Sequence, residues 1–321
     1  MARWTYPLTA VAGIVAVTLA GCTSQSETTP ADNAGGSTTQ GEVTHYPLTM
    51  DNCGEDIGFD SAPERVVLLE SAPVTILDRI GALDTVIARA GAFPPGYYDA
   101  DLEQRIDAID SLSDDIDGSG HLQITPEAAI AYEPDLARLP DGLSRAGLLD
   151  GDAHTLIQPN YCPTGEGDAT FDSLYEQVLD YGQIFDRLDE AEQLVTDLQG
   201  RVTAVETETA GGPERTAAVL YPSVGGGPLY AYGRASMAQP QLDAAGLTNV
   251  YLGRDPDVLI LLYQDEEEGI LEEVTNLPGS DALRALDNDD VLVQLFNFTE
   301  PVSPLTVTGL EQIAEQFGTG S

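Results

Sequence analysis

The chain has 321 residues, which is enough for one large domain or two lobes, and its hydrophobic content of 42% is ordinary for a globular protein. All 13 basic residues are Arg, and the absence of Lys excludes a Walker phosphate-binding loop, a Schiff-base lysine and an S-x-x-K hydrolase. The net charge of −41 argues against nucleic acid as a partner. It is explained either by solubility or by acidic docking points for a basic partner.

The amino terminus has the features of a bacterial lipoprotein leader. Arg3 precedes an apolar stretch at 8–19, which has signal-peptide length and is too short for a comfortable membrane span. The stretch runs into the lipobox LAGC, whose Cys22 is the residue that is acylated in such leaders. We expect a signal peptide and lipobox at 1–22, lipidation at Cys22 and a flexible tether at 23–42. An ordinary signal peptide with an incidental Cys is the alternative.

Two cysteines remain once Cys22 is lipidated, namely Cys53 and Cys162. Export places them in an oxidising compartment, which favours a disulfide between them. Two reduced and buried thiols remain the alternative, and a metal site would need further ligands.

Short apolar strands alternate with helical segments after the tether. Gly81 ends the first predicted helix, and Thr125, Pro126 and Glu127 provide an N-cap, a first-turn proline and an acid that favours a helix start. In the first half we expect strands at 64–69, at 84–89 and from 133 onward, and helices at 73–80 and 125–132. This alternation predicts α/β layers with parallel strands.

The second half repeats this order of elements. The sequence IGALDTVIA of the first half is echoed by AGLTNVYL, and EPDLARL is echoed by DPDVLILL, which indicates a weak internal duplication. In the second half we expect strands at 215–221, 249–252 and 257–262, and a helix at 239–245 that ends at Gly246.

A mostly helical stretch at 171–208 separates the two halves. Its apolar residues recur at helical spacing on one face, at Leu194, Leu198, Val202 and Val205. We therefore expect an N-terminal lobe at 43–170, connecting helices at 171–208 and a C-terminal lobe at 209–321. The predicted fold class is α/β, with two Rossmann-like α/β lobes joined by a long backbone helix. A ligand cleft is expected between the carboxyl ends of their strands.

Four stretches carry a resemblance to a known family, at 63–91, 124–136, 228–250 and 278–298. In their order and spacing they resemble the siderophore and cobalamin class of ABC substrate-binding proteins. The motifs DNCG and QPNYCP resemble those of actinobacterial-type members, and this supports the pairing of Cys53 with Cys162. One departure is that a helix of the family, expected between Val250 and Pro256, has no room here.

The resemblance implies a binding protein with no enzymatic activity and no cofactor. It would capture an iron–siderophore or a similar chelate between the lobes and deliver it to an ABC permease and its ATPase. Together with the lipobox, it implies a lipid-anchored protein on the extracytoplasmic face of the cell membrane.

Candidate ligand-binding residues lie on loops after the predicted strands. The loop after 84–89 offers Phe93, Tyr97 and Tyr98, which would stack on a flat chelate unless they pack back on their own lobe. Arg89 and Arg234 suit carboxylate or catecholate oxygens, and surface ion pairs are the alternative for both. The further candidates are His121, Tyr161, Tyr232, Asn297 and Phe298, although His121 also fits a solvated loop.

The sequence bears on four other functions. A zinc or manganese protein of this fold would need about three His and a carboxylate, but His45, His121 and His154 all lie in the first half. A haem-binding lipoprotein of the same fold and a structural surface lipoprotein remain alternatives. An enzyme is disfavoured because the sequence has no G-x-S-x-G, H-E-x-x-H or Rossmann glycine fingerprint.

Overall fold

The first lobe contains a five-stranded parallel sheet with the order β5-β4-β3-β6-β7. A computed structural model describes residues 43–116, 122–139, 153–162, 168–222, 228–264 and 267–318. The strands are β3 (Val66–Leu68), β4 (Val86–Ala90), β5 (Asp110–Ser113), β6 (Leu136–Leu139) and β7 (His154–Ile157), and the helices are α1 (Val74–Arg79), α2 (Ala100–Asp107) and α3 (Pro126–Ile130). These elements confirm the predicted strand and helix alternation.

The second lobe has a parallel sheet with the order β10-β8-β11-β12, to which β9 is added antiparallel to β8. Its strands are β8 (Arg215–Pro222), β9 (Leu229–Ala231), β10 (Leu247–Asn249), β11 (Val258–Tyr263) and β12 (Val291–Leu295). Its helices are α6 (Ala238–Ala244), α7 (Ile270–Thr275), α8 (Arg284–Asp287) and α9 (Leu305–Phe317). Both sheets bury nearly continuous apolar strands, as parallel sheets covered by helices on both faces do.

The two sheets share one strand order, except that the described part of the second lobe has no counterpart of β5. A single 3-10 turn at Leu252–Arg254 joins β10 to β11, where the first lobe has α2, β5 and α3 between β4 and β6. The strand predicted at 249–252 is wrong, because only Leu247–Asn249 pair with β8 and the chain then leaves the sheet. Tyr251, which the prediction placed in that strand, is 78% exposed.

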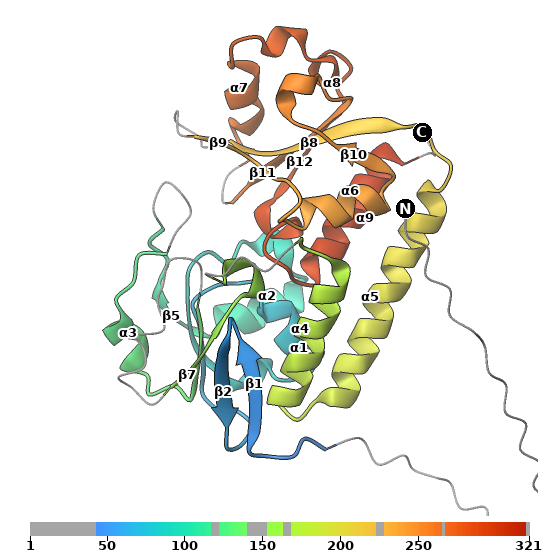
Figure 1. Cartoon of the computed structure of the whole chain (residues 1–321). Helices are drawn as coiled ribbons and strands as arrows, with labels where there is room; N and C mark the ends of the chain where they lie inside the picture. Colours follow the sequence, from blue (N-terminus) through green and yellow to red (C-terminus); the bar gives the residue numbers. More distant parts are fainter. Residues whose placement is uncertain are drawn as a thin grey trace, which may run out of the picture. The chain divides into compact units, whose positions relative to one another are not determined.

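The connecting segment is a hairpin of two helices, α4 (Phe171–Ile184) and α5 (Leu188–Thr209), which lie side by side in Figure 1. A capping box between Thr170 and Ser173 begins α4. The predicted apolar face of α5 is buried, and this helix packs against α1 of the first lobe and against α6 and α9 of the second. At 1.5 Å per residue α5 is about 33 Å long, which makes it a stiff link between the lobes.

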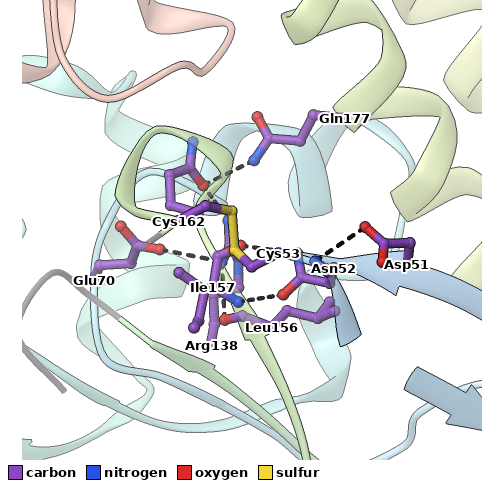
Figure 2. The surroundings of a disulfide bond; sticks show 11 residues. Asp51, Asn52, Cys53, Glu70, Arg138, Leu156, Ile157, Cys162 and Gln177 are labelled. Atoms are coloured by element: carbon purple, nitrogen blue, oxygen red, sulfur yellow. Dashed lines mark hydrogen bonds and ion pairs between the residues drawn. A yellow bond between two sulfur atoms is a disulfide. The ribbon is translucent and has the colours of Figure 1, made fainter. Parts of the chain in front are cut away.

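A disulfide fastens an amino-terminal hairpin to the first lobe. The hairpin consists of β1 (Leu48–Asn52) and β2 (Glu55–Phe59). Cys53 at its turn is bonded to Cys162, with 5.1 Å between the Cα atoms, so the predicted pairing is confirmed (Figure 2). Asn52 adds two hydrogen bonds to the backbone of Ile157, at 3.0 and 2.8 Å. The hairpin therefore fixes the end of β7 through the hydrogen bonds to Ile157, and it fixes the segment after β7 through the disulfide to Cys162.

Candidate functional site

A cavity of ≈ 700 Å³ lies at the carboxyl ends of the strands of both sheets. From the first lobe it is lined by residues that follow β3, β4, β5 and β7. From the second lobe it is lined by β9 and by residues at or after the ends of β8, β11 and β12. Ligands of open α/β sheets bind at this end of the strands, where the loops diverge and backbone groups become accessible. The topology of both lobes thus directs their loops toward one site.

An aromatic wall lines the cavity on the side of the second lobe. Phe296 is its centre, with its ring 5.4 Å from that of Tyr221 and 6.1 Å from that of Tyr232, both edge-on. The Tyr221 ring is also 6.3 Å from that of Tyr230. Tyr161 contributes one more aromatic side chain from the first lobe. Such a wall offers ring faces and edges to a flat apolar ligand surface and hydroxyl groups to its polar edge.

Glu300 brings a buried carboxyl group to the cavity. Its side chain is only 6% exposed, and its Oε1 accepts a hydrogen bond from the Met237 N–H at 2.8 Å. Burial raises the pKa of Glu300 to about 8, although the hydrogen bonds from Met237 and Ser236 act in the opposite direction. Burial also raises the pKa of Tyr232, and the nearby Glu300 carboxyl adds to that effect.

A second buried acid, Glu70, lies where β3 gives way to its loop, and it faces the buried Arg138 of β6 (Figure 2). Arg138 is 2% exposed, and its Nη1 is 3.7 Å from Glu70 Oε1. Arg138 also donates to the Leu156 carbonyl at 2.9 Å, to the Tyr181 hydroxyl and to the Gln158 side chain. Burial raises the pKa of Glu70 to about 7, and it outweighs the lowering by Arg138.

Arg234 forms an ion pair with Asp168 at the edge of the cavity, with 2.6 Å between Nη2 and Oδ2. The Arg234 side chain is 78% exposed, so this pair is in contact with solvent. The neighbouring Arg234 guanidinium lowers the pKa of Asp168 through hydrogen bonding and charge.

The two lobes meet directly beside the cavity. Asn297 Nδ2 donates to Ser71 Oγ at 2.8 Å, and the Asn297 N–H donates to the Tyr97 hydroxyl at 2.9 Å. The ring of Phe298 lies edge-on to that of Tyr97, with 5.5 Å between centroids. These contacts join the carboxyl end of β12 to loops of the first lobe.

Four of the ligand-binding candidates line the cavity, namely Tyr161, Tyr232, Arg234 and Asn297. Five described candidates do not line it: Arg89, Phe93, Tyr97, Tyr98 and Phe298. His121, like Cys22, lies outside the described residues.

We expected the aromatic loop of the first lobe to face the ligand. In the structure its side chains pack against other parts of the protein instead. Tyr97 and Tyr98 join an apolar cluster with Phe298 and Leu295 of the second lobe. The Arg89 guanidinium covers the Phe93 ring at 4.8 Å and donates to the Ile106 carbonyl at 3.1 Å. Contacts with the second lobe therefore occupy Tyr97 and Tyr98, and contacts within the first lobe occupy Arg89 and Phe93; no local sequence pattern encodes either set.

Sequence reasoning missed five residues that line the cavity with aromatic or acidic side chains, namely Glu70, Tyr221, Tyr230, Phe296 and Glu300. Tyr221 and Phe296 stand at or directly after strand ends, and that position was the available signal. Nothing in the sequence distinguishes Glu70 and Glu300 from the other acids among the chain's 54.

The described residues hold no group of three or more His, Cys, Asp or Glu side chains placed to bind a metal ion. His154, a candidate ligand in the metal hypothesis, instead packs its ring on Phe59 with 5.0 Å between centroids. Within the described part of the chain, the cavity is lined by aromatic and aliphatic side chains, by amide, hydroxyl and carboxyl groups, and by the Arg234 guanidinium.

Comparison with solved structures finds proteins that share this two-lobed fold. A crystal structure of the ABC-type Fe3+-hydroxamate transport system from Saccharomonospora viridis is 53% identical, with a TM-score of 0.82, and the match covers 85% of this chain and 100% of that one. A periplasmic binding protein from Veillonella parvula shares the fold at 20% identity and a TM-score of 0.67, covering 86% of this chain and 93% of that one. The same holds for a petrobactin-binding protein from Bacillus subtilis, at 14% identity and a TM-score of 0.61, covering 84% and 98%.

No curated protein matches the chain. The family model for periplasmic binding proteins matches residues 66–293, which include strands of both sheets and the whole connecting hairpin. With this match and the two-lobed fold, the chain belongs to the periplasmic binding protein family.

Proposed function

We propose that the chain is the ligand-capturing component of an ABC importer and that it binds a ferric hydroxamate siderophore in the cavity between its lobes. The observation that carries the proposal is the match over the whole length of the Saccharomonospora viridis Fe3+-hydroxamate transport structure, at 53% identity. The cavity supports it as well, because ≈ 700 Å³ lined by aromatic rings and a few polar groups suits a bulky chelate.

The cavity residues have distinct roles in this proposal. Phe296 and the tyrosines around it contact the chelate, and Tyr161 meets it from the first lobe. Arg234 approaches the ligand from the cavity edge, where its pair with Asp168 is weak enough to exchange partners because it is exposed to solvent. The bound chelate is released to a permease chemically unchanged, since the family is one of binding proteins.

Movement of the lobes is expected to be small. The helix α5 contacts both lobes, and the bonds of Asn297 to Ser71 and Tyr97 already connect them beside the cavity. Capture therefore requires a slight rotation about these contacts rather than a wide hinge opening.

Membrane attachment is part of the proposal. No helix among the described residues is both long and apolar enough to cross a membrane. We propose that acylation of Cys22 anchors the protein to the outer face of the cytoplasmic membrane and that residues 23–42 tether the lobes near the permease and its ATPase.

Calorimetry on the purified protein tests the proposed ligand class. The panel consists of a ferric hydroxamate, a ferric catecholate, haem and cobalamin, and we expect hydroxamate binding with a Kd of about 1 μM or tighter. The only Trp is Trp4 in the predicted signal peptide, so optical confirmation relies on tyrosine fluorescence. Absence of hydroxamate binding contradicts the proposal.

Arg234→Ala tests the placement of the site. Loss of a charge-assisted contact is expected to weaken hydroxamate binding by about ten- to a hundredfold. Arg187→Ala is the control, because Arg187 lies on the connecting hairpin, where it donates to the Asp186 carbonyl. Equal affinities of Arg234→Ala and the parent would leave the ligand class standing and remove Arg234 from the site.

A further inference from the structure

A short turn at the edge of the first lobe carries one of the residues that line the cavity. The edge strand β7 ends at Ile157, where its pairing with β6 also ends, and the chain then forms a 3-10 turn at Pro159–Tyr161. Tyr161 lines the cavity, and Cys162 directly after it is bonded to the amino-terminal hairpin. Because the turn lies beyond the sheet, contacts other than strand pairing determine where the Tyr161 ring lies.

Two adjacent residues of the hairpin hold this turn at its two ends (Figure 2). Asn52 accepts from the Ile157 N–H at 2.8 Å and donates to the Ile157 carbonyl at 3.0 Å, which fixes the chain before the turn. The disulfide between Cys53 and Cys162 fixes the chain directly after Tyr161. The position of the Tyr161 ring therefore depends on the position of the hairpin.

The hairpin is itself firmly attached to the first lobe. Its second strand ends at Phe59, which is 1% exposed and belongs to the hydrophobic core. The Phe59 ring also packs on His154 of β7, with 5.0 Å between centroids. Met50 and Ile57, one from each strand, pack against the same core. A hairpin attached in this way gives the turn a fixed support.

The start of the turn is also fixed from inside the protein. Gln158 is fully buried, and its side chain accepts from Arg138 and donates to the Val302 carbonyl of the second lobe. Val302 follows Pro301, which lines the cavity. Hydrogen bonds thus hold the turn at its start on two sides, whereas a covalent bond holds its end at Cys162.

We propose that the disulfide between Cys53 and Cys162 positions Tyr161 for ligand binding, in addition to stabilising the first lobe. This inference rests on the proposed function. Without the bond, Asn52 still holds Ile157, but the chain after Tyr161 is released and the binding conformation of the turn becomes one of several. The affinity for the chelate then falls in proportion to the population of that conformation.

Calorimetry on the full chain compares the parent protein with the double variant Cys53→Ser/Cys162→Ser. The probes are ferrichrome and ferrioxamine B, two ferric hydroxamates with different backbones. We expect the double variant to bind the probe that the parent prefers about tenfold more weakly, which corresponds to a binding conformation populated about one tenth of the time.

Ile80→Ala is the matched control for a general loss of stability. Ile80 is fully buried in the core of the same lobe, at the end of α1, and it does not line the cavity. We expect this variant to unfold at a lower urea concentration than the parent, because a buried side chain is truncated, and to bind both probes with the affinity of the parent.

A double-mutant cycle with Tyr161→Ala separates positioning of the ring from stabilisation of the lobe. Tyr161→Ala alone is expected to weaken binding by about tenfold, since it removes an aromatic contact of the cavity. In that background, loss of the disulfide is expected to change the affinity by less than about twofold, because the ring that the bond positions is already absent. A bond that only stabilised the lobe would act equally in both backgrounds. If the double variant does not fold, Asn52→Ala takes its place in the cycle, since it keeps the disulfide and releases Ile157.

Three results overturn the inference. Equal affinities of the parent and the variant without the disulfide refute it and leave the proposed function intact. An equal loss of affinity with and without the Tyr161 ring gives the bond a purely structural role and also refutes it. If the parent binds neither ferrichrome nor ferrioxamine B, the proposed function itself is contradicted, and the inference fails with it.

Discussion

Arg138 offers the sharpest test of how the first lobe is held together beneath the cavity. It is 2% exposed and donates to the Leu156 carbonyl, the Tyr181 hydroxyl and Gln158, while its charge faces Glu70. Gln158 in turn donates to the Val302 carbonyl of the second lobe. Arg138→Met keeps most of the apolar stem and removes every donor, so several buried acceptors lose their partner together.

The size of the effect follows from these contacts. A hydrogen bond from a charged donor contributes about 1.5–3 kcal/mol. Removing one partner of a buried ion pair costs about 3–5 kcal/mol, because the other charge is left buried and uncompensated. We expect Arg138→Met to lower the free energy of unfolding by about 3–5 kcal/mol. Arg284→Met is the control: Arg284 pairs with Asp255 and Asp257 but is 55% exposed, so its loss is expected to leave the free energy of unfolding nearly unchanged.

Urea unfolding followed by circular dichroism measures both variants. Adding Glu70→Gln to Arg138→Met is expected to cost less than the sum of the single changes, since the two side chains interact. A loss below about 1 kcal/mol for Arg138→Met would refute the view that this buried network stabilises the lobe.

Three further predictions concern other parts of the molecule. The bond between Cys53 and Cys162, which are 109 residues apart, is expected to leave neither of these two thiols free in a titration under denaturing conditions, and its removal by Cys162→Ser is expected to cost about 2–5 kcal/mol. The pKa of Glu300 is raised from 4.5 to about 8, so its contribution to stability is fully present below about pH 4.5 and is lost as the pH rises through about 8. At about 1.4 kcal/mol per pH unit this loss is on the order of 5 kcal/mol, and a Glu300→Gln protein that declines as steeply as the parent between about pH 5 and about pH 9 would contradict it. Mass spectrometry of the mature amino terminus is expected to find acylated Cys22, whereas an unmodified terminus beyond that residue would exclude the anchor.

The regular elements were predictable because their signals are local. The apolar spacing of Leu194 and Leu198 marks the buried face of α5, and the capping sequence at Thr125 marks the start of α3. The disulfide was also predictable, because an exported protein with two remaining cysteines has few alternatives. These inferences needed no knowledge of which segments meet in space.

The cavity wall was less predictable because it depends on contacts between distant segments. Tyr97 was expected to meet a ligand, but its hydroxyl accepts from the Asn297 N–H of the other lobe. Glu300 is one acid among many in the sequence, and only the fold shows that it is buried beside Met237. Burial of a polar side chain is a tertiary property, and composition does not reveal it.

The short edge of the second sheet has a consequence for recognition. Because β10 ends at Asn249, it pairs with β8 only as far as Ala217, and the rest of that side of β8 is open to another partner. The antiparallel β9 takes this place from Leu220 onward, and it places Tyr230 opposite Tyr221. The polypeptide thus doubles back beside β8 and brings the rings of Tyr230 and Tyr221 together at the cavity. In the first lobe β5 continues the sheet beyond β4, whereas in the described second lobe a strand that folds back along β8 supplies part of the cavity wall.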